Sequence, residues 1–309
     1  MRLGLTPWNF DDLSARGLTA QAAFAESLGY ESFWLPENHF NAQALPDPLM
    51  LLAGIAAGTQ TMRLATTSYL LPLRNPLLAA EQVAVLDQLS NGRVLLGIGR
   101  GYSKETLHAF DIEPGEKREL FEWCLNLILK AWTQEEVSLH DDGSSPVVVM
   151  PKPAQQPHPP LWIAAFGPKA LKQAGRLGMP YLASPIETFE QLKTNYERYD
   201  EAIAEHGHEP MTTRPIMRTM FVSDKSSLIN DIRDRLANME LPRGLKTSPQ
   251  VDDWAMLGDR YFVADKMAEH REALDATHIV VTRMRIAGVP ESETRESIST
   301  IAELAETDA

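Results

Sequence analysis

Three consecutive polar side chains interrupt an apolar run near the start of the chain. In the segment FWLPENHF, Glu37, Asn38 and His39 follow residues 33–36, and Phe40 closes the run. A carboxylate and an imidazole this close together can act as general acid and base in proton transfer. The alternative is that these side chains only cap a helix or bond loop backbone, so their position in the fold decides their role.

Glu37 and His39 are also residue types that bind metal ions. A protein zinc site needs three or four ligands, and the sequence offers no third ligand at a suitable spacing. We therefore expect no metal. An acyl-transfer nucleophile is not expected either, because the sequence contains no Gly-x-Ser-x-Gly segment.

A glycine-rich run, GIGRG, places Arg100 directly before Gly101. Glycines leave room for a phosphate or a planar ligand against the backbone, and a guanidinium can form paired hydrogen bonds with such a ligand. The run is not a dinucleotide-binding fingerprint, because the third glycine is wrongly spaced and the run lies mid-chain. A structural ion pair is the alternative role for Arg100.

The segment AAFGPKALKQAG, residues 164–175, predicts a turn from a strand into a helix. The free N–H groups at the start of a helix form a natural phosphate site. Phe166 and Gly167 are therefore candidate phosphate ligands through their backbone. An ordinary Gly-Pro turn is the alternative.

Strand-like and helical patterns alternate almost from end to end and must position these residues. The expected strands are 2–6, 32–35, 62–71, 94–99, 161–165, 179–183, 215–223 and 278–284. The expected helices are 19–29, 48–58, 75–92, 118–132, 169–178, 188–206, 227–239, 265–274 and 291–306. About eight strand–helix units predict a parallel sheet closed into a (β/α)₈ TIM barrel, an α/β fold. A doubly wound sheet is the alternative, but the first strand ends in TPWNF rather than in a glycine-rich phosphate loop.

Two stretches interrupt the alternation, although no shift in composition marks a domain boundary. Residues 134–160 contain Asp-Asp-Gly between β-branched runs and then several prolines, which predicts a hairpin and an exposed connection. Residues 241–261 predict an irregular insertion that is long enough to be a lid. We expect residues 1–309 to form a single barrel domain that carries these two insertions.

In such barrels the active site is built from the loops after the carboxyl ends of the strands. The candidate residues all fall at these positions, so we expect them to converge on one mouth. They are Glu37, Asn38, His39, Thr67, Ser68, Arg100, Gly101, Phe166, Gly167 and Ser184.

Composition excludes several partners. A net charge of −13 and a pI near 5.1 work against binding to nucleic acid or to an anionic membrane. The longest apolar run, residues 49–57, is far too short to span a bilayer, and the N-terminus has no signal-peptide pattern. With Cys124 as the sole cysteine, no internal disulfide can form, and we expect a cytoplasmic protein.

Three segments together resemble the bacterial luciferase-like flavin-dependent monooxygenases, along nearly the whole chain. They are GYESFWLPENHF, TTSYLLPLRNPLLAAEQVAVLDQLSNGRVLLGIGRGY and WIAAFGPKALKQAGRLGMPYLASP. The second is the most specific, because LLPL, a proline, LDQLSNGR and the glycine-rich strand end occur in order and at familiar spacing.

The resemblance implies roles for individual residues. Arg100 matches the family's flavin-phosphate arginine, Phe166 and Gly167 match its backbone phosphate contacts, and the bond from Thr67 to Ser68 matches a non-proline cis peptide. Ala170 stands where a phosphate-binding hydroxyl is expected. Asn38 stands where the family has its catalytic histidine, and an amide is no base near neutral pH; His39, Glu37 or a water would then transfer the proton.

The function implied is the oxygenation of a small organic substrate by O₂ and reduced FMN. The sequence shows no second nucleotide-binding domain, so a separate flavin reductase is expected to supply reduced FMN. The alternatives are hydride transfer with the deazaflavin F420, and flavin binding without catalysis. The resemblance also implies a homodimer formed through the helices at 48–58 and 76–90.

Overall fold

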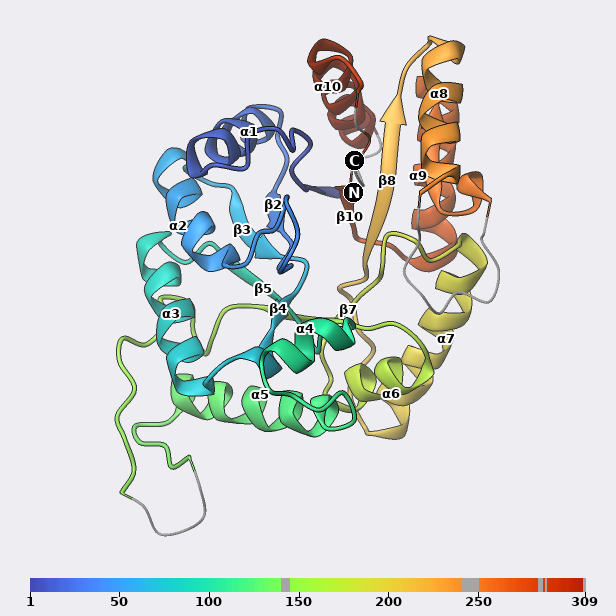
Figure 1. Cartoon of the computed structure of the whole chain (residues 1–309). Helices are drawn as coiled ribbons and strands as arrows, with labels where there is room; N and C mark the ends of the chain where they lie inside the picture. Colours follow the sequence, from blue (N-terminus) through green and yellow to red (C-terminus); the bar gives the residue numbers. More distant parts are fainter. Residues whose placement is uncertain (140–144, 240–249, 283–285, 287, 308–309) are drawn as a thin grey trace. The chain divides into compact units, whose positions relative to one another are not determined.

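The computed structural model describes residues 1–139, 145–239, 250–282, 286 and 288–307 (Figure 1). The chain forms two compact units, which are described separately. Unit 1 comprises Met1–Asp12, Gln21–Trp34 and Ala164–Ala309, and unit 2 comprises Leu13–Ala20 and Leu35–Ile163.

Strands and helices alternate along the chain as the sequence predicts. The strands are β1 (Arg2–Leu5), β2 (Ser32–Leu35), β3 (Arg63–Thr66), β4 (Tyr69–Leu70), β5 (Val94–Gly99), β6 (Leu161–Ala164), β7 (Tyr181–Leu182), β8 (Pro215–Val222), β9 (Ala255–Gly258) and β10 (His278–Thr282). The α-helices are α1 (Ala15–Ser27), α2 (Pro48–Gly58), α3 (Pro76–Leu89), α4 (Lys104–Ala109), α5 (Lys117–Thr133), α6 (Pro168–Arg176), α7 (Phe189–Glu205), α8 (Ser226–Ala237), α9 (Arg260–Leu274) and α10 (Glu291–Thr307). Two 3₁₀ helices, η1 (Leu71–Leu73) and η2 (Val251–Asp253), complete the described elements.

The strands of unit 1 pair in parallel around β1. Strand β1 pairs with β2 on one side, where Leu5 lies opposite Phe33, and with β10 on the other, where Leu5 lies opposite Val281. Strand β10 in turn pairs with β8, and β8 pairs with β9. Since the strands are parallel, the loops after their carboxyl ends lie along the same edge of the sheet.

Unit 2 has its own parallel strands, with β5 at the centre. Strand β5 pairs with β3, β4 and β6, and all six of its residues are buried. A run that is buried on both faces is apolar throughout, as VLLGIG is. Helices α2, α3 and α5 cover the outer side of these strands in Figure 1.

Helix α3 shows how the sequence starts and anchors an element of unit 2. The Asn75 side chain accepts hydrogen bonds from the N–H groups of Leu77 and Leu78, and Pro76 occupies the first helical position. From α5, the indole nitrogen of Trp132 donates to the carbonyl of Ala80, 3.0 Å away, and so ties the two helices together.

The structure differs from the sequence-based expectation in three stretches. Residues 67 and 68 leave the strand predicted at 62–71, which is therefore split into β3 and β4. The stretch 241–261, expected to be irregular, is regular from η2 onward, because it contains β9 and the start of α9. The remainder of the expected lid, residues 241–249, lies outside the described residues. Helix α4 was not predicted.

The hairpin expected within 134–160 is marked by a single antiparallel bridge between Val137 and Val147. Residues 140–144, where the chain would turn, lie outside the described residues. Among the helices that the structure describes, none is long and apolar enough to cross a membrane.

Candidate active site

Glu37, the first polar residue after β2, has its carboxylate completely buried and bonded on every side. Its Oε2 accepts the backbone N–H of Leu70 at 2.9 Å, and its Oε1 lies 2.8 Å from the guanidinium of Arg74. The ring nitrogen Nε2 of His39 lies 2.9 Å from the same Oε1. The exposed fraction of the Glu37 side chain is 0%, so the buried negative charge is balanced by Arg74.

This contact fixes the hydrogen position on the imidazole of His39. A carboxylate only accepts hydrogen bonds, so Nε2 of His39 carries the hydrogen that points to Glu37. In the neutral ring, Nδ1 is then the atom with a free lone pair. The arrangement is a carboxylate–imidazole pair, in which the acid orients the base.

Aromatic rings surround the imidazole. The ring of Phe110 lies edge-on to His39 with centroids 5.1 Å apart, and the ring of Phe40 lies 5.7 Å from it. Phe40 has φ of 59°, in the left-handed region that bulky residues rarely adopt. The loop therefore holds an aromatic ring close to the imidazole of His39.

The side chain of Asn38 bonds to the loop backbone at Leu45 and not to the imidazole of His39. Its side-chain oxygen accepts the N–H of Leu45 at 2.9 Å, and its own N–H donates to the carbonyl of Leu45. These two bonds close the loop between residues 38 and 45. The predicted catalytic role of Asn38 stays a prediction, and the geometry gives it a structural one.

Thr67 and Ser68 lie between β3 and β4, where the chain leaves the sheet. The N–H of Thr67 donates to the carbonyl of Leu35 at 3.0 Å. A Cβ added to Gly99 would overlap the Ser68 hydroxyl, so a glycine is needed there for Ser68 to pack against β5. Within the described residues the cis peptide bonds precede Pro151 and Pro157. The expected cis bond between Thr67 and Ser68 is therefore wrong for this structure.

Arg100 and Gly101, at the end of β5, lie in a cluster of cations that also contains Lys117 and Arg118. Burial and the charge of Arg118 lower the pKa of Arg100, although Glu122 opposes the shift. Burial, Arg100 and Arg118 likewise lower the pKa of Lys117, whose Nζ donates to the carbonyl of Gly101 at 2.8 Å. These three cations therefore lie close enough to disfavour one another's charge, and Glu122 compensates in part.

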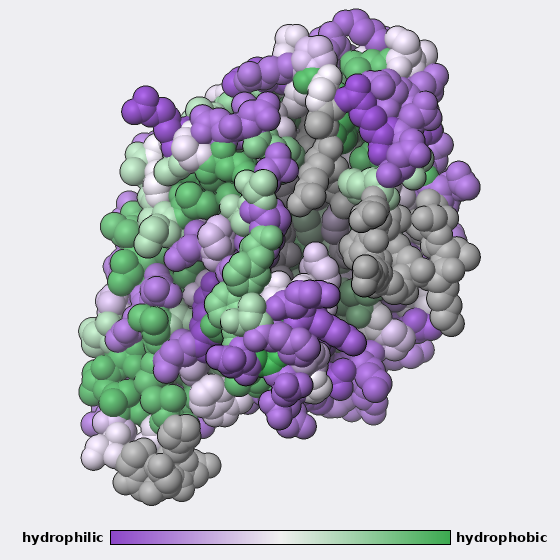
Figure 2. All heavy atoms as spheres, in the orientation of Figure 1, coloured by the Kyte–Doolittle hydropathy of each residue, from purple (hydrophilic) through white to green (hydrophobic). Residues whose placement is uncertain are grey.

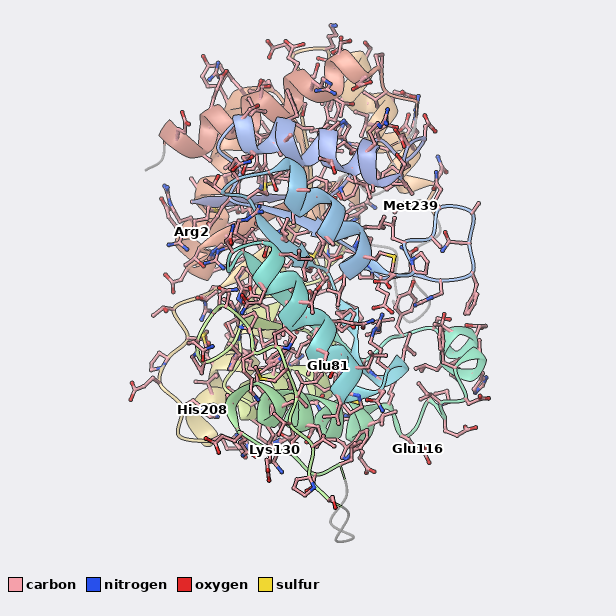
Figure 3. All side chains as sticks on the ribbon, turned by 90° about the vertical axis from the view of Figure 1, so that its left-hand side faces the viewer. Arg2, Glu81, Glu116, Lys130, His208 and Met239 are labelled. Carbon is pink, nitrogen blue, oxygen red and sulfur yellow. The ribbon has the colours of Figure 1, made fainter. Side chains whose placement is uncertain are left out.

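The start of α5 adds to this positive potential. Lys117 and Arg118 occupy its first positions, where the helix dipole favours acidic residues. The cap residue Glu116, labelled in Figure 3, makes no side-chain capping bond. Two basic residues at a helix N-terminus are therefore the sequence signal that could have predicted this cluster.

The remaining candidate residues lie in unit 1. Gly167 is the cap residue of α6, with φ of 84°, and no side chain caps this helix. The first-turn N–H of Lys169 therefore has no side-chain cap, as a backbone phosphate site requires. Phe166 is exposed beside it. Ser184 follows β7, and its N–H donates to the buried carboxylate of Glu187 at 2.5 Å.

The sequence analysis did not identify four residues of these clusters, which are Arg74, Lys117, Arg118 and Glu187.

In the part of the chain that the structure describes, no group of three or more His, Cys, Asp or Glu residues is placed to hold a metal ion. The seven candidates of unit 2 follow β2, β3 and β5, and the three of unit 1 follow β6 and β7.

Comparison with solved structures defines the fold class. A monooxygenase, RslO1 of Streptomyces bottropensis, matches with a TM-score of 0.82 at 22% identity, over 100% of both chains. The oxygenating constituent of the diketocamphane monooxygenase of Pseudomonas putida, solved with FMN, matches with a TM-score of 0.78 at 19% identity. It aligns over 98% of this chain and 97% of its own. The F420-dependent tetrahydromethanopterin reductase of Methanopyrus kandleri matches with a TM-score of 0.75 at 17% identity, over the same shares of the two chains. The fold is thus an α/β fold of the TIM-barrel type, as predicted.

The family model described as luciferase-like monooxygenase matches residues 5–278, so the chain belongs to that family. An uncharacterised protein of Sinorhizobium fredii is 30% identical over 71% of this chain and 64% of its own length. The alkanal monooxygenase alpha chain of the Kryptophanaron alfredi symbiont is 28% identical over 60% of this chain and 53% of its own. The chain thus spans about half to two thirds of the length of these relatives.

Proposed function

We propose that this chain is an FMN-dependent monooxygenase that uses reduced FMN and O₂ to oxygenate a small organic substrate. The observation that carries the proposal is the cation cluster of Arg100, Lys117 and Arg118. A bound phosphate would relieve the repulsion among these cations and would accept paired hydrogen bonds from Arg100. The residues present therefore fit the phosphate end of a flavin nucleotide.

Bound FMN would supply the redox chemistry, and the protein would supply binding, orientation and proton transfer. Arg100, Lys117 and Arg118 of unit 2 would hold the phosphate. His39, oriented by Glu37, would accept a proton at Nδ1 and return it. The rings of Phe40 and Phe110 would pack beside the imidazole.

The proposal includes two protein partners. The first is a separate reductase that delivers reduced FMN. The second is another copy of this chain, docked through α2 and α3. Helix α2 carries no charged side chain, and the two helices expose four large apolar residues, which are Met50, Leu78, Val85 and Leu89. Green atoms gather over this region in Figure 2, and Figure 3 shows the same face with Glu81 on α3.

Hydride transfer with F420 is the second candidate function. It is supported by the structural similarity to an F420-dependent reductase. The cation cluster fits the phosphate of either cofactor, so direct titration is needed to separate them.

The test begins with binding. We expect Arg100→Met to weaken FMN binding about tenfold or more, because a charge-assisted pair with the phosphate is lost. Arg2→Met is the matched control, because Arg2 is the first residue of β1, is not a candidate site residue, and has a side chain that is 67% exposed. Fluorescence titration with FMN and with F420 measures both variants.

The second step tests the chemistry. Reduced FMN is mixed with the wild-type protein without air, and oxygenated buffer is then added by stopped flow. Re-oxidation that is clearly slower than that of free FMN supports the proposal, since it requires a pocket that controls oxygen and water. If F420 binds and FMN does not, or if bound FMN re-oxidises as fast as free FMN, the proposal is overturned.

A further inference from the structure

A buried carboxylate in unit 1, Glu187, contacts one of the candidate flavin-site residues. The exposed fraction of Glu187 is 0%, and it precedes the cap residue of α7. Its Oε2 accepts the backbone N–H of Ser184 at 2.5 Å. Its Oε1 accepts the hydroxyl of Tyr181 at 2.6 Å and the side-chain amide of Asn195. All three partners are donors, so the site is built for an ionised acceptor.

These contacts join three consecutive pieces of structure. Tyr181 lies in β7, Ser184 in the turn that follows it, and Asn195 in α7. The N–H of Glu187 also donates to the carbonyl of Ser184 at 3.3 Å, which closes the turn on itself. The side chain and backbone of one residue thus determine where the backbone of Ser184 lies.

The charges around Glu187 are few. From β8, the buried guanidinium of Arg218 lowers the pKa of Glu187, and His270 of α9 contacts that guanidinium at 3.1 Å. Tyr181 and Tyr196 are the other titratable groups that face this cluster. Burial outweighs the favourable contacts and raises the pKa of Glu187 to about 7. The carboxylate therefore changes charge close to neutral pH.

We infer that Glu187 is a positioning residue for the proposed flavin site: its carboxylate holds the Ser184 backbone and so fixes the turn from β7 to α7. The inference rests on the proposed function, because it requires that Ser184, a candidate site residue after β7, contacts the bound flavin. Glu187 itself does not contact the cofactor. Replacement of its charge loosens the turn and weakens flavin binding without removing a ligand.

The experiment measures the turn and the cofactor separately. Amide hydrogen exchange of residues 183–188 is followed in cofactor-free protein, and FMN binding is titrated by fluorescence at about pH 6 and about pH 8. We expect Glu187→Gln to reduce protection of the Ser184 amide about tenfold and to weaken FMN binding by a similar factor, because the bond to a charged acceptor is lost. We expect the FMN affinity of the wild type to differ between about pH 6 and about pH 8, and the FMN affinity of Glu187→Gln to be the same at both pH values.

Two controls and one independent measurement complete the design. Glu190→Gln removes an exposed charge from the same helix and Tyr181→Phe removes one donor but leaves the Ser184 contact, so both are expected to keep flavin binding within about twofold. Wild-type protein should also lose protection at Ser184 between about pH 8 and about pH 6, after correction for intrinsic exchange. This last measurement needs no variant and stands even if Glu187→Gln does not fold.

Each outcome separates the inference from the proposed function. Unchanged protection at Ser184 in Glu187→Gln, or in wild type across this pH range, overturns the positioning role. Lost protection with unchanged FMN affinity overturns the link to the flavin site. If wild-type protein binds no FMN at all while protection changes as expected, the proposed function fails and the role of Glu187 in the turn remains.

Discussion

Two buried carboxylates have different partners. Glu37 is paired with the guanidinium of Arg74 within hydrogen-bonding distance. Glu187 accepts hydrogen bonds from Tyr181, Asn195 and the backbone of Ser184. Burial raises the pKa of Glu187, although these donors and the charge of Arg218 lower it.

Arg74 stabilises the fold by balancing Glu37. We expect Arg74→Leu to lower the free energy of unfolding by about 3 kcal/mol, because it leaves an uncompensated buried charge. Arg74 also lies 3.8 Å from the centre of the Tyr69 ring, a contact that leucine replaces only in part. Arg235→Leu, which breaks a partly exposed pair with Asp231, should cost at most about 1 kcal/mol. Equal losses in urea unfolding would contradict this prediction.

Glu187 and His270 give opposite dependences of stability on pH. The pKa of Glu187 is raised to about 7 from 4.5, so native protein keeps a proton that unfolded protein has released, and stability falls as pH rises between these values. Burial and then Arg218 lower the pKa of His270 to about 3 from 6.5, so its contribution is lost as pH falls through that range.

The difference between wild type and Glu187→Gln isolates the first of these effects. The measured quantity is the unfolding free energy of the wild type minus that of Glu187→Gln. We expect this difference to fall by about 3 kcal/mol as the pH rises from about 4.5 to about 7. Urea unfolding at several pH values measures the difference. A difference that does not change with pH would show that Glu187 has an ordinary pKa.

At the scale of elements, α6 and α7 of unit 1 pack closely at a glycine. A Cβ added to Gly175 would lie 2.6 Å from the Cβ of Ala202 and 3.0 Å from backbone atoms of Tyr199 and Ile203. Backbone atoms cannot move aside as a flexible side chain can. The two helices therefore approach each other only because residue 175 has no side chain.

Gly175→Ala should lower the free energy of unfolding by about 1–3 kcal/mol through overpacking. Gly115→Ala is the matched control, because no atom lies within 4 Å of the added Cβ. That variant should be neutral or gain a few tenths of a kcal/mol, by about the amount that unfolded-chain entropy falls. Thermal unfolding of both variants tests the pair, and a stable Gly175→Ala protein would contradict the packing argument.

Elements with a long, regular pattern could be predicted from the sequence. The strands at 32–35 and 94–99 and the helix at 48–58 begin and end where expected, because caps, prolines and glycines mark their ends. Helix α4 was missed because its six residues are too few to show a helical period. Strand β9 was missed because four residues after an irregular stretch carry no alternation, and its pairing with β8 decides its structure.

The same distinction applies to the candidate site. Glu37 and His39 could be found because they are neighbours in sequence and follow an apolar strand. Arg74 lies far from Glu37 in sequence, so only the fold reveals their contact. The partners of Glu187 come from β7 and α7, and the carboxylate looks from the sequence like an ordinary acidic residue before a helix.

For the whole molecule, the apolar surface of α2 and α3 predicts self-association. The double variant Leu78→Arg with Leu89→Arg places charge on two side chains that are 52% and 61% exposed. We expect it to be monomeric where the wild type is dimeric, because a charge in an apolar interface is costly to desolvate. Tyr261→Arg, on a residue of α9 that is 77% exposed, should leave the wild-type mass unchanged. Light scattering measures all three, and a monomeric wild type would end the dimer proposal.

The bonds of Asn38 have a consequence for the redesign of this chain. The Asn38 side-chain oxygen closes the loop by accepting the N–H of Leu45. Asn38→His would introduce an imidazole at this position and would remove that bond. A design that places a histidine here must therefore also change how residues 38–45 are closed.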